Sequence, residues 1–223
     1  MNIRTDIRAR LCALTALALL VPALSGCFGA AAVGVGTGAL MLADRRNSES
    51  FLSDEGAELR ALSRISENYG DKVHVNVTSY NRMMLLTGEV PSEAIKTGVE
   101  RLAAGVPNVK SIANELAIAG ASSFGGRSND AYITSKVKAR FVDASKFSPN
   151  HVKVVTEAGV VFLLGLVTQA EAAAAVEIAR TTGGVQKVVR VFEIVSPDQA
   201  RALDNITPPQ PAPATDAKPA VKK

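Results

Sequence analysis

The sequence predicts an α+β fold made of two tandem copies of one αββαβ unit, each with a three-stranded mixed sheet packed on two helices. The first observation is an internal repeat, because a shift of 77 positions places residues 151–176 on residues 74–99. After a one-residue slip, residues 185–194 fall on residues 109–118. The second observation is that each copy switches from helical to alternating apolar spacing. A self-match of this length indicates two copies of one supersecondary unit.

The first copy is expected over residues 53–119. A helix starting near Ser53 has an apolar stripe at helical spacing, and residues 73–78 then alternate apolar and polar as a half-buried strand does. A second strand over 83–90, a second helix opened by Pro91 and Ser92, and a third strand over 109–118 complete the unit. The helix stripes are Leu59, Leu62 and Ile65, then Ile95, Val99 and Leu102.

The second copy is expected over residues 130–195, after a flexible Ser- and Gly-rich linker at 120–129. Asp130 is predicted to cap its first helix, and a turn at 157–159 joins the first two strands. Thr168 and Glu171 have the spacing of a capping box, which starts the second helix. The predicted buried stripe of the first helix is Ile133, Val137 and Phe141.

The ends of the chain have distinct compositions. Residues 1–26 combine three arginines with a short apolar run, which predicts a secretory leader. The small, glycine-rich residues that follow predict a lipidated tether over 27–52 and lack the strand, helix and Lys of a phosphate-binding loop. Residues 196–206 predict a short helix with proline at its first position, and the proline-rich residues 207–223 predict a disordered tail.

The leader ends in Leu24-Ser25-Gly26-Cys27, which resembles a bacterial lipobox. Small residues before the cut let an extended backbone enter the peptidase, and a thiolate carries the thioether-linked glyceride. Cys27 is therefore the predicted lipidation site, and its diacylglycerol and N-acyl chain are the only attached groups expected. The alternative is a plain secretory protein with a free Cys27.

The charge distribution argues against a nucleic-acid partner. The sequence pI is near 9.2, but the first copy carries a small negative excess, the second a small positive one, and no dense basic patch exists. We therefore expect no nucleic-acid binding.

The leader, the lipobox and the two repeats together resemble the dual BON-domain lipoproteins. The most specific pieces are residues 86–90, residues 161–168 and the valines that start the third strands. The resemblance implies an αββαβ fold in each repeat, with no catalysis. It also implies an outer-membrane anchor, for which Phe28 after the lipidated Cys27 is suitable, and exposure to the periplasm. It further implies contact with phospholipid through the first helix of the second repeat.

That helix contains Tyr132-Ile133-Thr134-Ser135-Lys136-Val137, and helical spacing puts Tyr132, Lys136 and Arg140 on the flank beside the apolar stripe. A tyrosine ring suits a membrane interface, and cations suit an anionic leaflet. Tyr132, Lys136 and Arg140 are therefore the predicted lipid-binding residues. The alternative is an ordinary solvated helix edge. The matching helix of the first repeat offers Glu55, Glu58 and Arg64 and no such aromatic residue, so it is not expected to bind anionic lipid.

Other candidate sites are interpreted as architecture. His74 and His151 occupy matched strand-start positions and are predicted to be exposed, with no accompanying metal ligands. No nucleophile elbow, carboxylate pair or zinc signature appears, so neither an enzyme nor a metal site is expected. Gly88 and Gly165 are predicted structural glycines, needed for a bulge or a close approach.

The lipobox and the charged helix face, taken with the resemblance, predict a lipid-anchored outer-membrane protein that faces the periplasm and binds an anionic phospholipid membrane through its second repeat. A role in envelope integrity is implied by the resemblance alone. A partner protein of the envelope is also compatible with it. The alternative function is a protein-interaction scaffold that touches lipid only through its acyl anchor.

Overall fold

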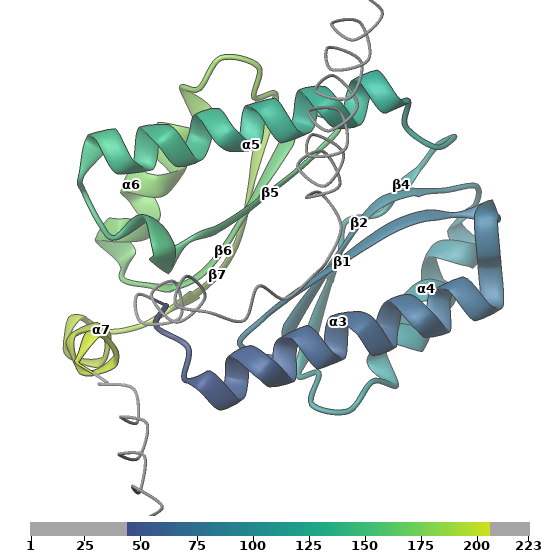
Figure 1. Cartoon of the computed structure of the whole chain (residues 1–223), viewed down its shortest axis with the longest axis horizontal. Coiled ribbons are helices and arrows are strands. Elements are labelled where there is room, and N and C mark those ends of the chain that lie inside the picture. The colour runs from purple at the N-terminus through teal and green to yellow at the C-terminus, as the bar shows by residue number, and fades with distance from the viewer. Residues whose placement is uncertain (1–43, 206–223) are drawn as a thin grey trace, which may run out of the picture. The chain divides into compact units, whose positions relative to one another are not determined.

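The computed structural model describes residues 44–205, all within one compact unit. The predicted leader, Cys27, most of the tether and the tail at 207–223 lie outside these residues. The predicted α+β fold with two copies of one unit is confirmed (Figure 1).

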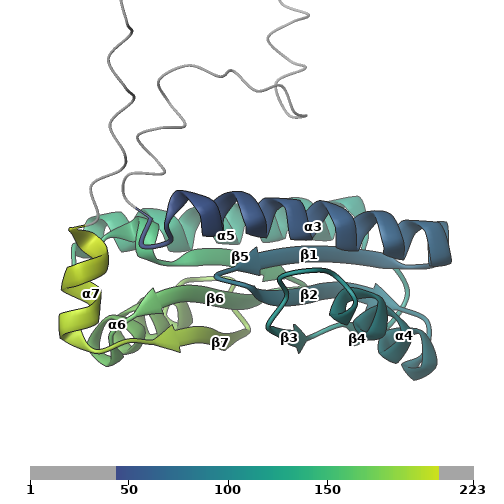
Figure 2. The same ribbon diagram turned by 90° about the horizontal axis from the view of Figure 1, so that it is seen from below.

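The first repeat contains two helices and a mixed sheet. Its elements are α3 (Ser48–Tyr69), β1 (His74–Tyr80), β2 (Met83–Val90), α4 (Glu93–Ala104), β3 (Ser111–Asn114) and β4 (Ala117–Ile118). The second repeat follows the same order and adds a helix. Its elements are α5 (Phe124–Ala144), β5 (Lys153–Glu157), β6 (Val160–Val167), α6 (Gln169–Arg180), β7 (Lys187–Ile194) and α7 (Pro197–Asp204), the last at one end of the second repeat (Figure 2).

The middle strand of each sheet pairs in two directions. β2 is antiparallel to β1 and parallel to β3 and β4, and β6 is antiparallel to β5 and parallel to β7. The single strand predicted over 109–118 is wrong in one respect, because it is interrupted between β3 and β4. There Leu116 is buried and its N–H is turned toward Asn114 Oδ1 at 3.3 Å.

The central strands are buried on both faces, which explains the apolar sequence of β6 and of the first half of β2. On β6, Val161 and Leu163 pack under α5 and α6, whereas Phe162 and Leu164 belong to a separate cluster. That separate cluster also contains Tyr80 and Leu85 of the first repeat, so the helix-free faces of the two sheets form a shared apolar core.

The predicted stripe of α3 is wrong. The helix begins at Ser48 with Asn47 as its N-cap, so residues 48–52 are not part of a tether. Leu59 is 69% exposed and Leu62 is also exposed. Ile65 is buried as predicted, and the rest of the buried stripe is Asp54, Ala57 and Ala61. Small alanines let the helix approach its sheet closely, so the leucines fall on the outer side.

The linker prediction is wrong for residues 124–129, because α5 already begins at Phe124. Ser123 is the N-cap and accepts a hydrogen bond from the Gly126 N–H at 3.1 Å. Asp130 therefore lies inside the helix and caps nothing. The capping boxes predicted at Thr168–Glu171 and Ser196–Gln199 are confirmed, and each starts its helix as expected.

Asp54 and Asp130 are equivalent buried residues that hold the hairpin turns. Asp130 accepts from the N–H groups of Ala158 and Gly159 at 2.9 and 2.8 Å. Asp54 accepts from those of Asn81 and Arg82 at 2.7 and 2.9 Å. In both turns the two central residues have positive φ, and the aspartate satisfies their backbone donors.

Gly88 and Gly165 lie where two backbones approach closely. A Cβ on Gly88 would stand 2.1 Å from the His74 carbonyl oxygen, and one on Gly165 would stand 2.3 Å from that of His151. Gly88 also has a φ of +111°. The close approach is made by the preceding segment of chain rather than by the following helix, and it requires glycine at both positions.

Candidate functional site

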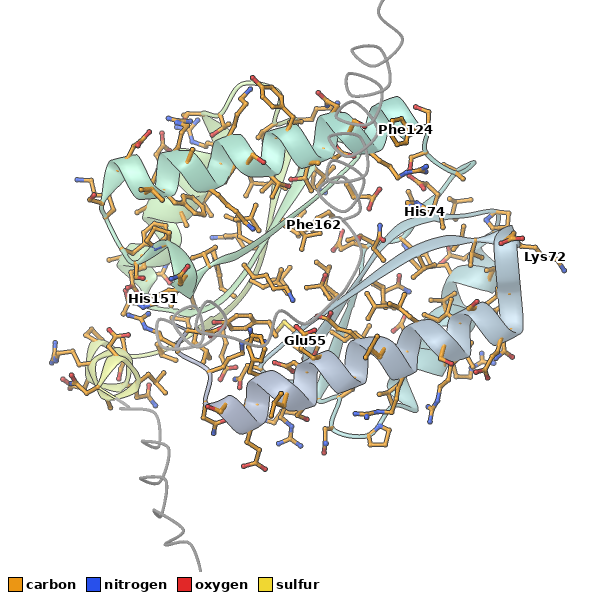
Figure 3. All side chains as sticks on the ribbon, viewed as in Figure 1. Glu55, Lys72, His74, Phe124, His151 and Phe162 are labelled. Atoms are coloured by element: carbon orange, nitrogen blue, oxygen red, sulfur yellow. The ribbon has the colours of Figure 1, made fainter. Side chains whose placement is uncertain are left out.

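The exposed face of α5 carries apolar side chains in a line. Phe124 is 80% exposed, Tyr132 63% and Val142 60%. At about 100° per residue these three side chains fall within about 80° of one another, opposite the buried Ile133, Val137 and Phe141. Phe124 lies at the N-terminal end of the helix (Figure 3). Exposed apolar side chains therefore run along the whole length of α5.

Both predicted cations, Lys136 and Arg140, form contacts within the protein. Arg140 donates to the Ile178 carbonyl and to Thr182 Oγ1, both at 2.8 Å, so it fixes α5 to the C-terminal end of α6. Lys136 donates to the Gly183 carbonyl, and its ammonium lies 5.0 Å from the centre of the Tyr132 ring. Tyr132 and Lys136 are thus brought together, whereas Arg140 is directed to the end of α6, and both cations are half-buried.

Sequence reasoning missed Phe124, Lys138 and Val142. Lys138 is exposed and lies about 40° from the line of Phe124 and Val142, on the side away from Tyr132. Phe124 was missed because Gly125 and Gly126 suggested a linker, which placed the start of the helix too late. Lys138 and Val142 lie inside the predicted helix but away from the Tyr132 flank to which the resemblance pointed. The usable signal for the earlier start was Ser123, a favoured N-cap residue.

The matching helix of the first repeat has the opposite charge. α3 carries five carboxylates and two arginines, whereas α5 carries four cations and two carboxylates. Leu52 and Leu59 of α3 are exposed apolar residues, so both helices have apolar outer positions. Only α5 combines such positions with a positive balance.

The prediction of exposed, unaccompanied histidines is wrong for both. His74 is half-buried, and its Nδ1 lies 2.8 Å from Glu89 Oε2. His151 is 9% exposed and lies 3.6 Å from Glu171 Oε1 and 3.4 Å from Asp204 Oδ1. The partners come from other strands and helices, so no local spacing could reveal them. The two histidines lie on opposite sides of Phe162 (Figure 3).

The surroundings of His151 are dominated by Arg45, which precedes α3. Its guanidinium bonds Glu171 and Asp204 at 2.7 Å each and donates to the Leu166 carbonyl at 2.9 Å. Burial, joined by the positive charge of Arg45, lowers the pKa of His151 against the opposing effect of the two carboxylates. Burial alone would raise the pKa of Glu171, but its bonds to Arg45 and Thr168 lower it to about 2.

Arg46 forms a second buried ion pair beside the first. It bonds Asp44 at 2.7 Å and Asp54 at 2.9 Å, and its guanidinium lies 4.2 Å from the centre of the Tyr80 ring. Residues 44–47 are therefore fixed to both repeats. This arm was predicted as part of the tether, and that prediction is wrong for these residues.

None of the helices between residues 44 and 205 is both long and apolar enough to cross a bilayer.

Comparison with known proteins gives relatives over most of the chain. The chain is 36% identical over 182 residues to the outer membrane lipoprotein DolP of Haemophilus influenzae, covering 79% of this chain and 94% of the relative. It is 34% identical to a 21 kDa hemolysin of Actinobacillus pleuropneumoniae, covering 68% and 79%. It is 29% identical to the osmotically-inducible protein Y of Escherichia coli, covering 62% and 71%. None of these names describes a chemical reaction.

The BON domain model matches residues 53–120 and again residues 129–196. These two matches coincide with the two αββαβ units of the structure. The chain therefore belongs to the BON-domain family, as a DolP-like protein with two such domains.

Proposed function

We propose that this protein is an outer-membrane lipoprotein, anchored through acyl chains on Cys27, whose second BON domain binds anionic phospholipid through α5. It faces the periplasm and supports envelope integrity by binding rather than by catalysis, and it uses no cofactor. The name of the Haemophilus relative and the lipobox-like Leu24-Ser25-Gly26-Cys27 support the anchor.

The observation that carries the lipid contact is the outer face of α5. Phe124, Tyr132 and Val142 are each at least 60% exposed, and together they present apolar area beside Lys136 and Lys138. Burying an exposed Phe stabilises by about 2 kcal/mol, and each cation near an anionic leaflet adds about 1 kcal/mol. Tyr132 suits the interface because its hydroxyl can stay hydrated while its ring is buried.

A few such residues make a weak site, and the anchor makes it effective. Two or more acyl chains hold a protein stably at a membrane, whereas one chain does so only marginally. Once the protein is anchored, binding of α5 becomes an intramolecular step with a high effective concentration of lipid. A modest intrinsic affinity is then sufficient.

Liposome co-sedimentation of the non-lipidated chain from residue 28 onward tests this proposal. We expect binding to anionic vesicles that falls with added salt, and weak binding to zwitterionic vesicles. Phe124→Glu and Tyr132→Glu should each lower the binding about tenfold, because each removes apolar contact and adds a negative charge. Unchanged binding by both variants would overturn the site.

Leu59→Glu is the matched control. Leu59 is as exposed as Tyr132 but lies on the acidic α3, so its change should leave vesicle binding unaltered. If the parent chain bound no vesicle at all, the alternative function, a protein-interaction scaffold that touches lipid only through its anchor, would be favoured.

A further inference from the structure

Three potential metal ligands converge where the two repeats meet. The ligand atoms of His74, Glu89 and Glu157 all lie within 4.8 Å of one another, and His74 Nδ1 lies 2.8 Å from Glu89 Oε2. His74 and Glu89 face each other across β1 and β2, whereas Glu157 ends β5 of the second repeat. The group therefore joins the two repeats.

The two carboxylates are buried without a matching cation. Glu89 is 6% exposed and Glu157 is 9% exposed. Among residues 44–205, no Lys or Arg forms an ion pair with either of them. Glu157 accepts a hydrogen bond from Asn76 Nδ2 at 2.8 Å, which does not neutralise its charge. Burial, together with the charge of Glu89, raises the pKa of Glu157.

The repeat shows that the fold does not require these carboxylates. The equivalents of His74 and Glu89 in the second repeat are His151 and Leu166, and the equivalent of Glu157 in the first is Tyr80. At the other end of the interface, around His151, the carboxylates of Asp44, Asp54 and Glu171 are each paired with an arginine. A surplus of buried negative charge is therefore confined to the His74 end, although burying an unpaired charge is costly.

A further polar group beside the cluster lacks a partner. The Ser122 N–H donates to Glu89 Oε2 at 3.1 Å, and the hydroxyl of the same residue is buried with no hydrogen-bond partner among the described residues. A buried hydroxyl without a partner is uncommon in native proteins and calls for a bound water or ion.

We propose that His74, Glu89 and Glu157 bind a divalent transition metal, with Zn²⁺ the best fit, and that the ion links the two BON domains. Imidazole nitrogens and carboxylate oxygens both bind Zn²⁺, and three protein ligands with water in the fourth position are a common arrangement. Tetrahedral ligands about 2.1 Å from an ion stand roughly 3.4 Å apart, so modest side-chain shifts suffice. The ion offsets the surplus charge, and the Ser122 hydroxyl can donate to a carboxylate or to the bound water.

Isothermal titration of the whole chain with ZnCl₂, after treatment with EDTA and dialysis in detergent, tests the proposal. We expect one ion per chain bound through this site at micromolar or lower concentration, with Mg²⁺ binding far more weakly, because Mg²⁺ prefers oxygen ligands. Glu157→Gln and His74→Asn should each weaken Zn²⁺ binding at least about tenfold. Wild-type affinity in both variants, or no binding by the parent, would overturn the site.

Glu193→Gln is the matched control, because Glu193 Oε2 also accepts from an asparagine of the first repeat, Asn81 Nδ2, at 2.8 Å. This variant should bind Zn²⁺ like the parent. The chain has two histidines in all, so their imidazole NMR signals are easily assigned by substitution. Zn²⁺ should shift the His74 signal and leave that of His151 in place, and the reverse result would contradict the proposal.

Discussion

His74 and His151 stand at equivalent points of the two BON domains, and their surroundings have opposite electrostatic character. Around His74, two buried carboxylates face one imidazole, and no Lys or Arg of residues 44–205 pairs with them. Around His151, the carboxylates of Glu171 and Asp204 are bonded by Arg45. The two domains therefore share a backbone fold but differ in the charged side chains at the two ends of their interface. We propose a function for the positions that differ.

The first helices of the two domains, α3 and α5, also differ in charge although they occupy equivalent positions. Both pack a narrow stripe on their sheet, yet α3 is acidic and α5 is basic with Phe124 and Tyr132 on its outer face. A duplicated unit thus keeps its core and its turns, whereas its outer faces diverge. The following experiments test how far the two domains remain equivalent.

The largest effect is expected from the glycines that the two repeats share. Gly165→Ala should destabilise the protein by about 3 kcal/mol, because its Cβ would clash with the His151 carbonyl oxygen, and Gly88→Ala by more, because φ is also positive. Urea unfolding measures both. Gly120→Ala is the control, since no atom lies within 4 Å of its Cβ position, and it should change little. A harmless Gly165→Ala would refute the close approach.

Arg45→Gln should remove the ion pairs that distinguish the surroundings of His151 from those of His74. It leaves Glu171, Asp204 and the Leu166 carbonyl without their shared donor, so we expect a loss of about 3 kcal/mol in unfolding free energy near pH 7. The exposed pair of Arg180 and Glu177 provides the control, and Arg180→Gln should cost less than about 1 kcal/mol. Equal losses in the two variants would contradict a special role for Arg45.

A smaller effect concerns the pH dependence of stability. The pKa of His151 is lowered in the folded protein, so the unfolded chain takes up a proton first as the pH falls through about 6.5. Stability that is present above this pH is lost as the pH falls toward the folded pKa. His151→Asn should flatten the decline in melting temperature between about pH 7 and pH 5, and an unchanged slope would contradict it.

The smallest effect is expected at Glu157 in the presence of EDTA. Replacing a buried carboxylate that lacks a cationic partner by an amide of the same shape should be neutral or stabilise by up to about 1 kcal/mol. With Zn²⁺ present the order should reverse, because the parent chain gains stability from the ion and Glu157→Gln does not. Thermal melts of both proteins with and without Zn²⁺ check this crossover. If Glu157→Gln destabilised the protein in EDTA, the result would contradict an excess of buried negative charge at Glu89 and Glu157.

Much of the fold could be predicted from local pattern. The repeat follows from a self-match 77 positions apart, and the second strands and the capping box at Thr168 follow from neighbouring residues in the sequence. The stripe of α3 could not be predicted, because Ala57 and Ala61 pack inward while the more apolar Leu59 is exposed. The inward face of α3 is thus determined by how closely the helix packs on its sheet, and not by which side chains are most hydrophobic.

The candidate sites were predictable only in part. Tyr132 and Lys136 were identified from helical spacing and family resemblance, and the structure brings them into contact. The carboxylates beside His74 come from β2 and β5, so only the folded chain brings them together. Arg140 donates to the Ile178 carbonyl at the end of α6. The sequence of α5 alone could not predict this contact.

The arm at residues 44–47, whose Arg45 and Arg46 are buried, has a consequence for mechanical load on the chain. A pull on the chain at residue 44 acts first on Arg45 and Arg46, whose ion pairs reach Glu171, Asp204 and Asp54 in both repeats. The force is thereby shared between the two domains before it can unwind α3. If the chain is anchored through Cys27, as we propose, a force from the membrane should therefore act on both domains together.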